Sequence, residues 1–253
     1  MADEPIIRVE NLSAGYDGTV ILDDLTFDVK PGEVFVILGG SGCGKSTLLK
    51  HMIGLYPPAR GKILIEGRDL AAAEGRERLG ILRRIGVMYQ MGALFGSMTL
   101  LQNVRLPLEE YTDLPDDAID AIARMKLRLV ALQGFEHHAP SEISGGMKKR
   151  AAIARAMALD PRILFLDEPS AGLDPITSAE LDQLIVRLAR SLGITFVVVT
   201  HELASIYAIA DRVIMLDKRV RKIVATGKPA ELRDGSENPW VRQFFKREAA
   251  ETR

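Results

Sequence analysis

A glycine-rich segment ending in Lys-Ser carries the residue types that bind a phosphate chain. It follows a continuous apolar run at 34–38, which is typical of a buried parallel strand, and it precedes a helical pattern over 46–55. Glycines let backbone N–H groups surround phosphate oxygens, and a helix N-terminus adds partial positive charge. A plain glycine-rich turn is the alternative, but the full match to G-x-x-x-x-G-K-S/T between a strand and a helix favours phosphate binding.

We expect this phosphate loop to act through its backbone amides and through Lys45, whose ammonium would neutralise the β- and γ-phosphates of a nucleotide. The Ser46 hydroxyl would ligate Mg²⁺. Cys43 is interpreted as a small loop residue and not as a nucleophile. The residues predicted to bind the nucleotide here are Gly39, Gly40, Ser41, Gly42, Cys43, Gly44, Lys45, Ser46 and Thr47.

Two adjacent carboxylates stand where a second apolar run ends. Asp167 and Glu168 follow residues 163–166. A carboxylate at a strand end can hold Mg²⁺ through water while its neighbour polarises the attacking water. On their own, two acids after a strand would more often belong to a solvated loop. With a phosphate loop in the same chain, we expect Asp167 to serve the metal and Glu168 to act as the catalytic base, which must stay ionised.

Two further polar residues follow apolar strand patterns and suit the same reaction. His201 follows the apolar run at 195–200 and can contact the γ-phosphate or orient Glu168 and the water. Gln90 follows the short strand pattern at 85–89, and a neutral amide there can reach both Mg²⁺ and the water. The other histidines lack this position and are interpreted as packing or surface residues: His51, His137 and His138.

Tyr16 and the segment 144–147 extend the predicted nucleotide site. Tyr16 lies in a turn upstream of the phosphate loop, where an aromatic ring can stack on adenine, although a turn tyrosine more often only packs. Ser144 is suited to cap a helix that opens with Gly145 and Gly146, and these glycines expose backbone N–H groups to a second anion. A capped helix with no ligand is the alternative for this segment.

Taken together, these motifs resemble the nucleotide-binding subunits of ABC transporters, in that family's order over nearly the whole chain. The matching segments are 39–46, Gln90, 144–146, 167–168, 171–174 and 200–201. The resemblance implies an α/β fold: a P-loop NTPase (RecA-like) core with an antiparallel β subdomain and an inserted α-helical subdomain. It also implies a homodimer that sandwiches two ATP molecules with Mg²⁺ and hydrolyses them.

In that family the phosphate loop of one subunit faces the Ser-Gly-Gly helix of the other, so the resemblance implies that residues 144–146 act in trans. Asp174 lies in the segment that links the two sites, and the implied nucleotide contacts include Asp174 and Met147. Gln90 would begin the loop that signals to a membrane-spanning permease on a separate chain. The implied catalytic residues are Lys45, Gln90, Glu168 and His201, and the implied metal ligands are Ser46, Gln90 and Asp167.

One departure from the family pattern points to a subfamily. Most ABC proteins carry Gln where this chain has Met147, and a thioether cannot donate a hydrogen bond, so binding there would depend on Ser144 and the glycine amides. The segment 144–152, together with 94–99 and 174–177, resembles the MlaF-like subfamily. Those ATPases serve Mla systems, which move phospholipids between bacterial membranes with MCE-domain proteins and act at the cytoplasmic face of the inner membrane.

The elements that must position these residues alternate between strands and helices, which predicts a parallel sheet covered on both faces. Residues 96–158 interrupt this alternation with helical patterns only. We therefore predict a core of 1–95 and 159–238, with an N-terminal β subdomain, and a helical subdomain of 96–158. In the latter, the helical pattern at 116–132 carries an apolar stripe at Ile122, Met125, Leu129 and Leu132.

The predicted tail, 239–253, begins with the pattern of a short amphipathic helix and ends in charged residues. Its apolar positions include Trp240, Val241, Phe244 and Phe245. Such a helix would either cover its own domain or contact the other subunit, and the sequence favours neither.

Composition limits the other function classes. The chain has 253 residues, 47% of them hydrophobic, which is enough for one large domain or a domain with a subdomain. A net charge of −1 gives no general attraction to nucleic acid, and the single cysteine suits a reducing compartment. The acidic start does not resemble a signal peptide, and no apolar run approaches the about 18 residues that span a bilayer. Another chain would have to cross the membrane.

Three alternatives stand beside a MlaF-like lipid-transport ATPase. One is the ATPase subunit of an importer or exporter for another solute. Another is a soluble ABC protein of DNA repair or translation, but such proteins usually carry a long coiled-coil insertion or a second cassette, and the sequence has neither pattern. The third, a P-loop kinase for a small molecule, leaves Ser144, Met147 and His201 unexplained.

Overall fold

The protein consists of two β-sheets and the helices that cover them. This computed structural model describes residues 4–247; residues 1–3 and 248–253, which include the charged end of the predicted tail, lie outside the described part. The strands are β1 (Ile7–Tyr16), β2 (Thr19–Val29), β3 (Val34–Gly39), β4 (Arg60–Ile65), β5 (Arg68–Asp69), β6 (Ile85–Met88), β7 (Ile163–Asp167), β8 (Thr195–Val199), β9 (Arg212–Asp217) and β10 (Lys222–Gly227). The helices are α1 (Lys45–Met52), α2 (Gly75–Leu82), α3 (Leu100–Tyr111), α4 (Asp116–Leu129), α5 (Gly145–Ala156), α6 (Pro175–Leu192), α7 (Leu203–Ile209), α8 (Pro229–Gly235) and α9 (Pro239–Lys246), with a 3-10 turn at η1 (Pro140–Glu142).

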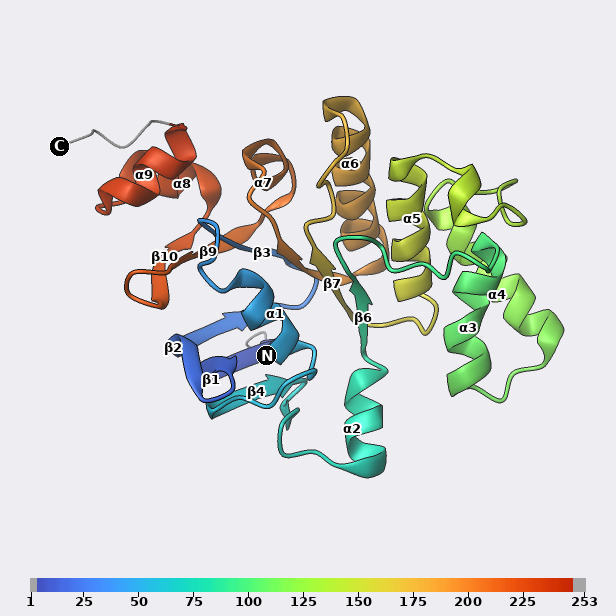
Figure 1. Cartoon of the computed structure of the whole chain (residues 1–253), viewed down its shortest axis with the longest axis horizontal. Coiled ribbons are helices and arrows are strands. Elements are labelled where there is room, and N and C mark those ends of the chain that lie inside the picture. The colour runs from blue at the N-terminus through green and yellow to red at the C-terminus, as the bar shows by residue number, and fades with distance from the viewer. Residues whose placement is uncertain (1–3, 248–253) are drawn as a thin grey trace.

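The larger sheet is mostly parallel, with the strand order β10-β9-β3-β8-β7-β6. Neighbouring strands from β9 to β6 pair in parallel, and β10 adds an antiparallel edge. Parallel neighbours need long crossover connections, which here contain helices, and these lie on both faces of the sheet (Figure 1). The predicted α/β core is confirmed.

Both faces of this sheet are buried, as its continuous apolar strands require. Along β3, Val34, Val36 and Leu38 belong to one hydrophobic cluster, whereas Phe35 and Ile37 belong to another. Helix α1 and the smaller sheet cover one face, and α5, α6 and α7 cover the other (Figure 1). The strand ends between these layers are therefore held from both sides.

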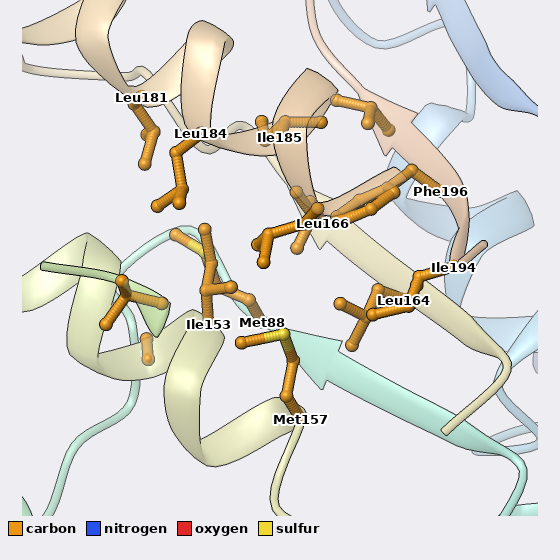
Figure 2. Close-up of a cluster of buried hydrophobic side chains, with 14 of the residues drawn as sticks. Met88, Ile153, Met157, Leu164, Leu166, Leu181, Leu184, Ile185, Ile194 and Phe196 are labelled. Carbon is orange, nitrogen blue, oxygen red and sulfur yellow. The ribbon is translucent and has the colours of Figure 1, made fainter. Parts of the chain in front are cut away.

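Apolar contacts attach α5 and α6 to the main sheet, as Figure 2 shows. Full burial of a leucine, isoleucine, methionine or phenylalanine side chain contributes about 1.5–3 kcal/mol to the free energy of folding. The contact fixes α5 over β6 and β7, the strands that precede Gln90 and Glu168. The labelled side chains are Met88, Ile153, Met157, Leu164, Leu166, Leu181, Leu184, Ile185, Ile194 and Phe196.

The smaller sheet is antiparallel, in the order β2-β1-β4-β5. β1 and β2 form a hairpin in which Tyr16 pairs with Thr19. The two residues between them, Asp17 and Gly18, have φ angles of 49° and 77°, as a type I′ turn requires. This sheet is the predicted antiparallel β subdomain, and its hairpin turn carries Tyr16.

Between β6 and β7 the described chain forms helices and no strand, in agreement with the predicted helical insertion. Helix α3 begins with a capping box between Thr99 and Gln102. Buried Asn103 holds the loop before it, because its amide accepts a hydrogen bond from the Phe95 N–H and donates to the carbonyls of Phe95 and Met98. One hydrophobic cluster continues from these helices into the main sheet, so the boundaries at 96 and 158 stay a prediction.

The apolar stripe predicted for 116–132 is correct in part, because Leu132 is buried and Ile122 and Leu129 pack partly buried against the core, whereas Met125 is exposed. The fully buried apolar residues of α4 itself are Ile119, Ala123 and Leu127. The physical reason lies on α3, where Arg105 binds the carboxylates of Asp116 and Asp120. Because residues 116, 120, 123 and 127 share one side of the helix, these ion pairs turn that side toward α3.

Several elements had no clear pattern in the sequence, namely α2, α8, β5 and β10. The edge strand β10 is only partly buried and contains Lys222 and Gly227, so it lacks the apolar alternation of a half-buried strand. Helix α2 is short and places only Ile81 in the core. Neither element carries a residue of the predicted site.

Close packing of α5 on β6 predicts that Gly86 tolerates no side chain. A Cβ atom at Gly86 would lie 2.1 Å from the carbonyl oxygen of Ala156 and 2.6 Å from the Leu164 side chain. We expect Gly86→Ala to lower the free energy of unfolding by about 1–3 kcal/mol or more, as overpacking does. Urea denaturation measures this change.

Gly80→Ala is the matched control, because Gly80 lies inside α2 and its nearest neighbour to a new Cβ is the end of Arg68 at 3.9 Å. Alanine favours a helix interior over glycine by up to about 1 kcal/mol, so this variant should be neutral or more stable. Equal urea midpoints for the two variants would contradict the packing of α5 against β6.

Candidate functional site

Parallel pairing brings three strand ends of the main sheet to one edge. Ile37 of β3 pairs with Val199 of β8, and Val199 pairs in turn with Asp167 of β7. The phosphate loop, the acidic pair and His201 directly follow these positions. Residues far apart in sequence therefore lie side by side at the carboxyl end of the sheet, where ligands of open α/β sheets bind.

The phosphate loop and the first residues of α1 line a cavity of about 740 Å³. Gly44 precedes α1 with a φ of 99°, and no side chain caps the helix. The first backbone N–H groups of α1 are thus left for a ligand, as anion binding at a helix N-terminus requires. The cavity contains every predicted residue of the loop from Gly39 to Thr47, together with Gln90, Glu168 and His201.

Lys45 and Cys43 occupy different surroundings in this loop. The Lys45 ammonium donates to the carbonyls of Gly39 and Gly40 at 2.9 and 3.3 Å, so the charge is held over the loop. Cys43 is buried, and burial raises the pKa of its thiol. A buried thiol with a raised pKa is a poor nucleophile, which agrees with its interpretation as a small loop residue.

The two carboxylates after β7 are buried to a degree that is costly for charged groups. Burial raises the pKa of Asp167, the charge of Glu168 raises it further, and Lys50, Lys45 and Lys149 lower it. Within residues 4–247, Asp167 Oδ1 and Glu168 Oε2 have no hydrogen-bond partner. Buried acceptors without donors favour a bound cation or water at this point.

Glu168 is also held in an uncommon backbone conformation. Its φ is 47°, in the left-handed region. Non-glycine residues rarely adopt this conformation, and holding one there costs about 1–3 kcal/mol of conformational energy. The Glu168 N–H donates to the Val199 carbonyl at 2.8 Å. Its side-chain Oε1 lies 2.8 Å from His201 Nδ1. If Glu168 serves as the general base, its ionised carboxylate only accepts hydrogen bonds, and His201 Nδ1 would be the donor of this pair.

Lys149 of α5 was not singled out by the sequence but reaches the same site. Its side chain is buried, and its ammonium donates to the carbonyl oxygens of Gln90 and Glu168. Burial lowers the pKa of Lys149, while the carboxylates of Glu168 and Asp167 raise it. A lysine within the run Lys-Lys-Arg of a helix resembles a solvent-facing residue, so no sequence signal marked it.

Tyr16 does not line the cavity of the phosphate loop. It lies in a neighbouring cavity, with Lys50 and Tyr56 among the lining residues. Its ring packs edge-on against Tyr56 at 4.9 Å, and the Lys50 ammonium lies 5.8 Å from its centroid. Stacking of Tyr16 on adenine therefore stays a prediction.

The segment 144–147 lies apart from the phosphate loop of its own chain. The Ser144 hydroxyl caps α5 by accepting a hydrogen bond from the Met147 N–H at 3.3 Å, as predicted. Ser144, Gly146 and Met147 line a separate cavity of about 260 Å³ with residues of α6, and they do not line the cavity of the phosphate loop. Within one chain the two predicted anion sites are thus different places.

Asp174 caps α6 and is not among the residues that line the cavity of the phosphate loop. Its Oδ1 accepts hydrogen bonds from the N–H groups of Ile176 and Thr177, both at 3.0 Å. These bonds, and one from the Thr177 hydroxyl, hold the pKa of Asp174 below its usual range. The Thr177 methyl faces Gly146, where an added Cβ would lie 2.4 Å away. The capped end of α6 therefore packs on the start of α5.

Helix α9 contacts the phosphate loop, which the sequence did not predict. Val241 and Phe245 are buried against their own chain, so one face of the predicted amphipathic helix covers its own domain. Phe244 lines the cavity of the phosphate loop, and a Cβ at Gly40 would lie 3.8 Å from the Trp240 ring. Spacing alone predicts the helix but not its position. Contact with another subunit stays a prediction.

Comparison with known proteins decides the family. The sequence model described as ABC transporter matches residues 22–171, more than half of the chain. This chain belongs to the ABC transporter family. It is the ATP-binding and ATP-hydrolysing component, since solved ATP-binding cassettes share its fold. These include the dimeric MJ0796 in a post-hydrolysis state bound to ADP and Pi, with a TM-score of 0.78, 30% identity and coverage of 88% of this chain and 98% of that one.

Further matches cover most of the length of this ABC ATPase. It is 31% identical to cbiO1 from Clostridium perfringens, part of the ABC transporter complex cbiONQ, with a TM-score of 0.84 and 93% coverage of both chains. It is 40% identical over 247 residues to the intermembrane phospholipid transport system ATP-binding protein MlaF of Haemophilus influenzae, covering 98% of this chain and 92% of that protein. It is 44% identical over 239 residues to the probable ribonucleotide transport ATP-binding protein mkl of Mycobacterium leprae, covering 94% of this chain and 68% of that protein.

The Nδ1 contact predicts which replacement of His201 preserves activity. An asparagine amide can take the place of Nδ1, whereas a glutamine amide reaches toward the place of Nε2. Loss of a hydrogen bond to a charged group costs about 1.5–3 kcal/mol, or roughly 10- to 100-fold in rate. We expect His201→Ala and His201→Gln to lose roughly 10- to 100-fold in the rate of ATP turnover, and His201→Asn to lose less.

Steady-state hydrolysis of ATP by the full chain measures this order, with His137→Ala as the control. His137 is an exposed histidine of the helical segment, and its removal should leave turnover unchanged. If glutamine preserved activity better than asparagine, the pair between Nδ1 and Glu168 would not be the contact that matters.

Proposed function

We propose that this chain drives the transport of phospholipid between bacterial membranes, as the ATPase of an MCE-type system. The observation that carries the proposal is the likeness to MlaF proteins over nearly the full length of both chains, 98% and 92% for the Haemophilus influenzae protein. The Escherichia coli K12 protein of the same name is 39% identical and covers 95% of this chain. Met147, in place of the glutamine that most ABC proteins carry, supports the same subfamily.

The alternative cargo is a small polar solute. The name of the mkl relative contains ribonucleotide transport, and its identity of 44% is of similar size. This chain, however, spans 68% of that protein. The similarity to mkl therefore supports a transport ATPase in general, whereas the similarity to MlaF supports phospholipid as the cargo.

The nucleotide site is proposed to form between two copies of the chain. Lys45 and Ser46 of one subunit would bind the phosphates, and Ser144, Gly145 and Gly146 of the other would cover them. The separate cavities of these segments within one chain support this arrangement, because one chain does not bring the two segments to a common cavity. The dimeric MJ0796 cassettes show that relatives of this fold pair. Met147, Asp174 and Tyr16 are proposed to contribute further contacts.

The residues at the strand ends fit a magnesium ion bound with the nucleotide. Asp167 Oδ1 is a buried acceptor without a partner in the described chain, and Ser46 lines the cavity of the phosphate loop together with Gln90 and Glu168. Carboxylate, hydroxyl and amide oxygens are ligands that Mg²⁺ accepts, so Asp167, Ser46 and Gln90 would hold it. The ion would neutralise charge that develops on the phosphates.

The protein's own groups would carry out the rest of the reaction. Glu168 accepts the proton of the attacking water, whose oxygen bonds to the γ-phosphorus while the bond to ADP breaks. His201 holds Glu168 in place through Nδ1. The Lys45 ammonium stabilises the added negative charge.

A membrane-spanning partner on a separate chain is proposed to dock at the segment that follows Gln90. Each helix of the described residues, 4–247, is too short or too polar to span a bilayer. Met91 and Phe95 are 89% and 49% exposed, and exposed apolar groups of this size often mark an interaction site. We place the ATPase at the cytoplasmic face of the inner membrane, with an MCE-domain protein in the same complex.

Glu168→Gln should give a nucleotide-locked dimer that hardly turns over. An amide cannot accept the proton of the attacking water, and loss of a general base costs about 10²–10⁴-fold in rate. ATP then bridges the two subunits without being cleaved. Light scattering with and without ATP measures the mass of this variant.

The control is the double variant Lys45→Ala/Glu168→Gln, which lacks the phosphate-binding ammonium and should stay monomeric with ATP. A Glu168→Gln variant that stays monomeric with ATP, both alone and with its membrane partner, contradicts the shared site. Normal ATP turnover by Glu168→Gln contradicts the role of the carboxylate.

The proposed cargo predicts ATP-dependent transfer of phospholipid. The complex purified from its native membrane should contain phospholipid and an MCE-domain chain, both identified by mass spectrometry. Reconstituted, it should move a fluorescent phospholipid between donor and acceptor vesicles with ATP, and the Glu168→Gln complex should not. Transfer of ribonucleotide without movement of lipid would support the alternative cargo instead.

A further inference from the structure

One side chain of α5 connects the helical segment to the backbone of both residues that handle the water. Lys149 is only 8% exposed. Its ammonium donates to the Gln90 carbonyl, and to the Glu168 carbonyl at 3.4 Å. Gln90 follows β6 and Glu168 follows β7, so Lys149 joins three elements at one point. A buried ammonium needs such acceptors, because a charged group without hydrogen-bond partners in an apolar interior is energetically costly.

The same face of α5 holds the rest of the loop after Gln90. Arg155 donates to the carbonyls of Gly92 at 3.1 Å and Ala93 at 2.7 Å. Between these two cations, the Ala152 methyl faces Gly92, 3.4 Å from where a Cβ would stand. Residues 149, 152 and 155 recur every three positions and so share one side of the helix. The segment 90–93 is therefore fastened to α5 and must follow its movement.

Glu168 depends on neighbours to keep its left-handed backbone. Its N–H is held by β8, and its carbonyl accepts from the Ala171 N–H at 3.2 Å as well as from Lys149. Of these contacts, the one from Lys149 comes from the helical segment. A shift of α5 would thus act directly on the backbone that aims the Glu168 carboxylate.

The N-terminus of α5 is the part of the helix that is proposed to contact the ATP of the second subunit. Ser144, Gly145 and Gly146 form this end of the helix, little more than one turn from Lys149. These are the residues proposed above to contact the ATP held by the second subunit. A helix is stiff over so short a length, since each residue adds a backbone hydrogen bond.

We propose that Lys149 is a positioning residue that couples capture of the partner's ATP at the α5 N-terminus to the placement of Gln90 and Glu168 in its own subunit. Each subunit then prepares its own water for attack only when its α5 has closed on the ATP of the other subunit. This coupling makes the two hydrolysis sites cooperative. It rests on the proposed shared site and on the proposed roles of Gln90 and Glu168.

The test compares Lys149→Met, which keeps the apolar stem and removes the donors, with Lys149→Arg, which keeps donors and charge. Lys148→Met is the matched control, because Lys148 is the neighbouring lysine of α5 and makes neither contact. Hydrolysis by the full chain is measured against ATP concentration. Binding of a slowly hydrolysed ATP analogue and thermal unfolding are measured in parallel.

We expect Lys149→Met to lose about 10- to 100-fold in kcat, as for lost hydrogen bonds from a charged group. Affinity for the analogue should change by less than about threefold, because Lys149 does not touch this subunit's own nucleotide loop. The dependence of rate on ATP concentration should change from cooperative to hyperbolic. Lys149→Arg should recover most of the rate and the cooperativity, and Lys148→Met should match the unaltered chain.

Two results would overturn the coupling. One is turnover and cooperativity in Lys149→Met equal to those of Lys148→Met. The other is an equal loss in Lys149→Met and Lys149→Arg with a parallel fall in melting temperature, which marks a purely structural lysine. If Lys149→Met does not fold, Lys149→Gln, whose amide is uncharged and one atom shorter than the lysine side chain, must show the loss of cooperativity. Failure of the proposed function is seen separately, as normal turnover in Glu168→Gln.

Discussion

A pair of adjacent carboxylates at the buried end of a central strand is the constraint on which the rest of the site depends. Two negative charges are costly in a protein interior when their acceptor atoms, as here among residues 4–247, have no hydrogen-bond partner. The structure offsets this cost with the ammonium groups of Lys45 and Lys50 of α1 and of Lys149 of α5, and with the contact between Glu168 and the His201 imidazole after β8. A metal with bound nucleotide would complete the balance. The positive charges placed around the two carboxylates thus also prepare the site for phosphate chemistry.

Sequence patterns predicted the parts of the site whose physics is local. The phosphate loop, the acidic pair and His201 each follow an apolar strand directly, and parallel pairing brings such strand ends together wherever the chain forms this sheet. The Ser144 cap was predictable for the same reason, since its hydrogen bond spans three residues. The α/β core and the antiparallel sheet followed from alternating patterns, and the structural neighbours confirm them.

The parts that depend on contacts between distant segments could not be predicted. The buried side of α4 was predicted only in part: Met125 is exposed, and the side that carries Asp116 and Asp120 is turned toward Arg105 of α3. Lys149 and Phe244 reach the site through tertiary packing and carry no sequence signal of their own. The ring of Tyr16 packs on Tyr56 in a second cavity, a contact that its position before the phosphate loop does not indicate, and its stacking on adenine stays a prediction. In each case the helix or turn was foreseeable and its partner was not.

The central claim is that the phosphate loop of one copy meets the α5 N-terminus of another. Cys43 is the chain's single cysteine, so a Cys43→Ser background allows one cysteine to be placed in each partner. One preparation carries Ser41→Cys in the phosphate loop, and the other carries Ser144→Cys at the start of α5. The most direct measurement is cross-linking of their mixture by a short bifunctional maleimide, with and without a slowly hydrolysed ATP analogue. The account predicts a cross-linked heterodimer that forms with the analogue and not without it. A mixture that gives no cross-link with the analogue bound would contradict the shared site.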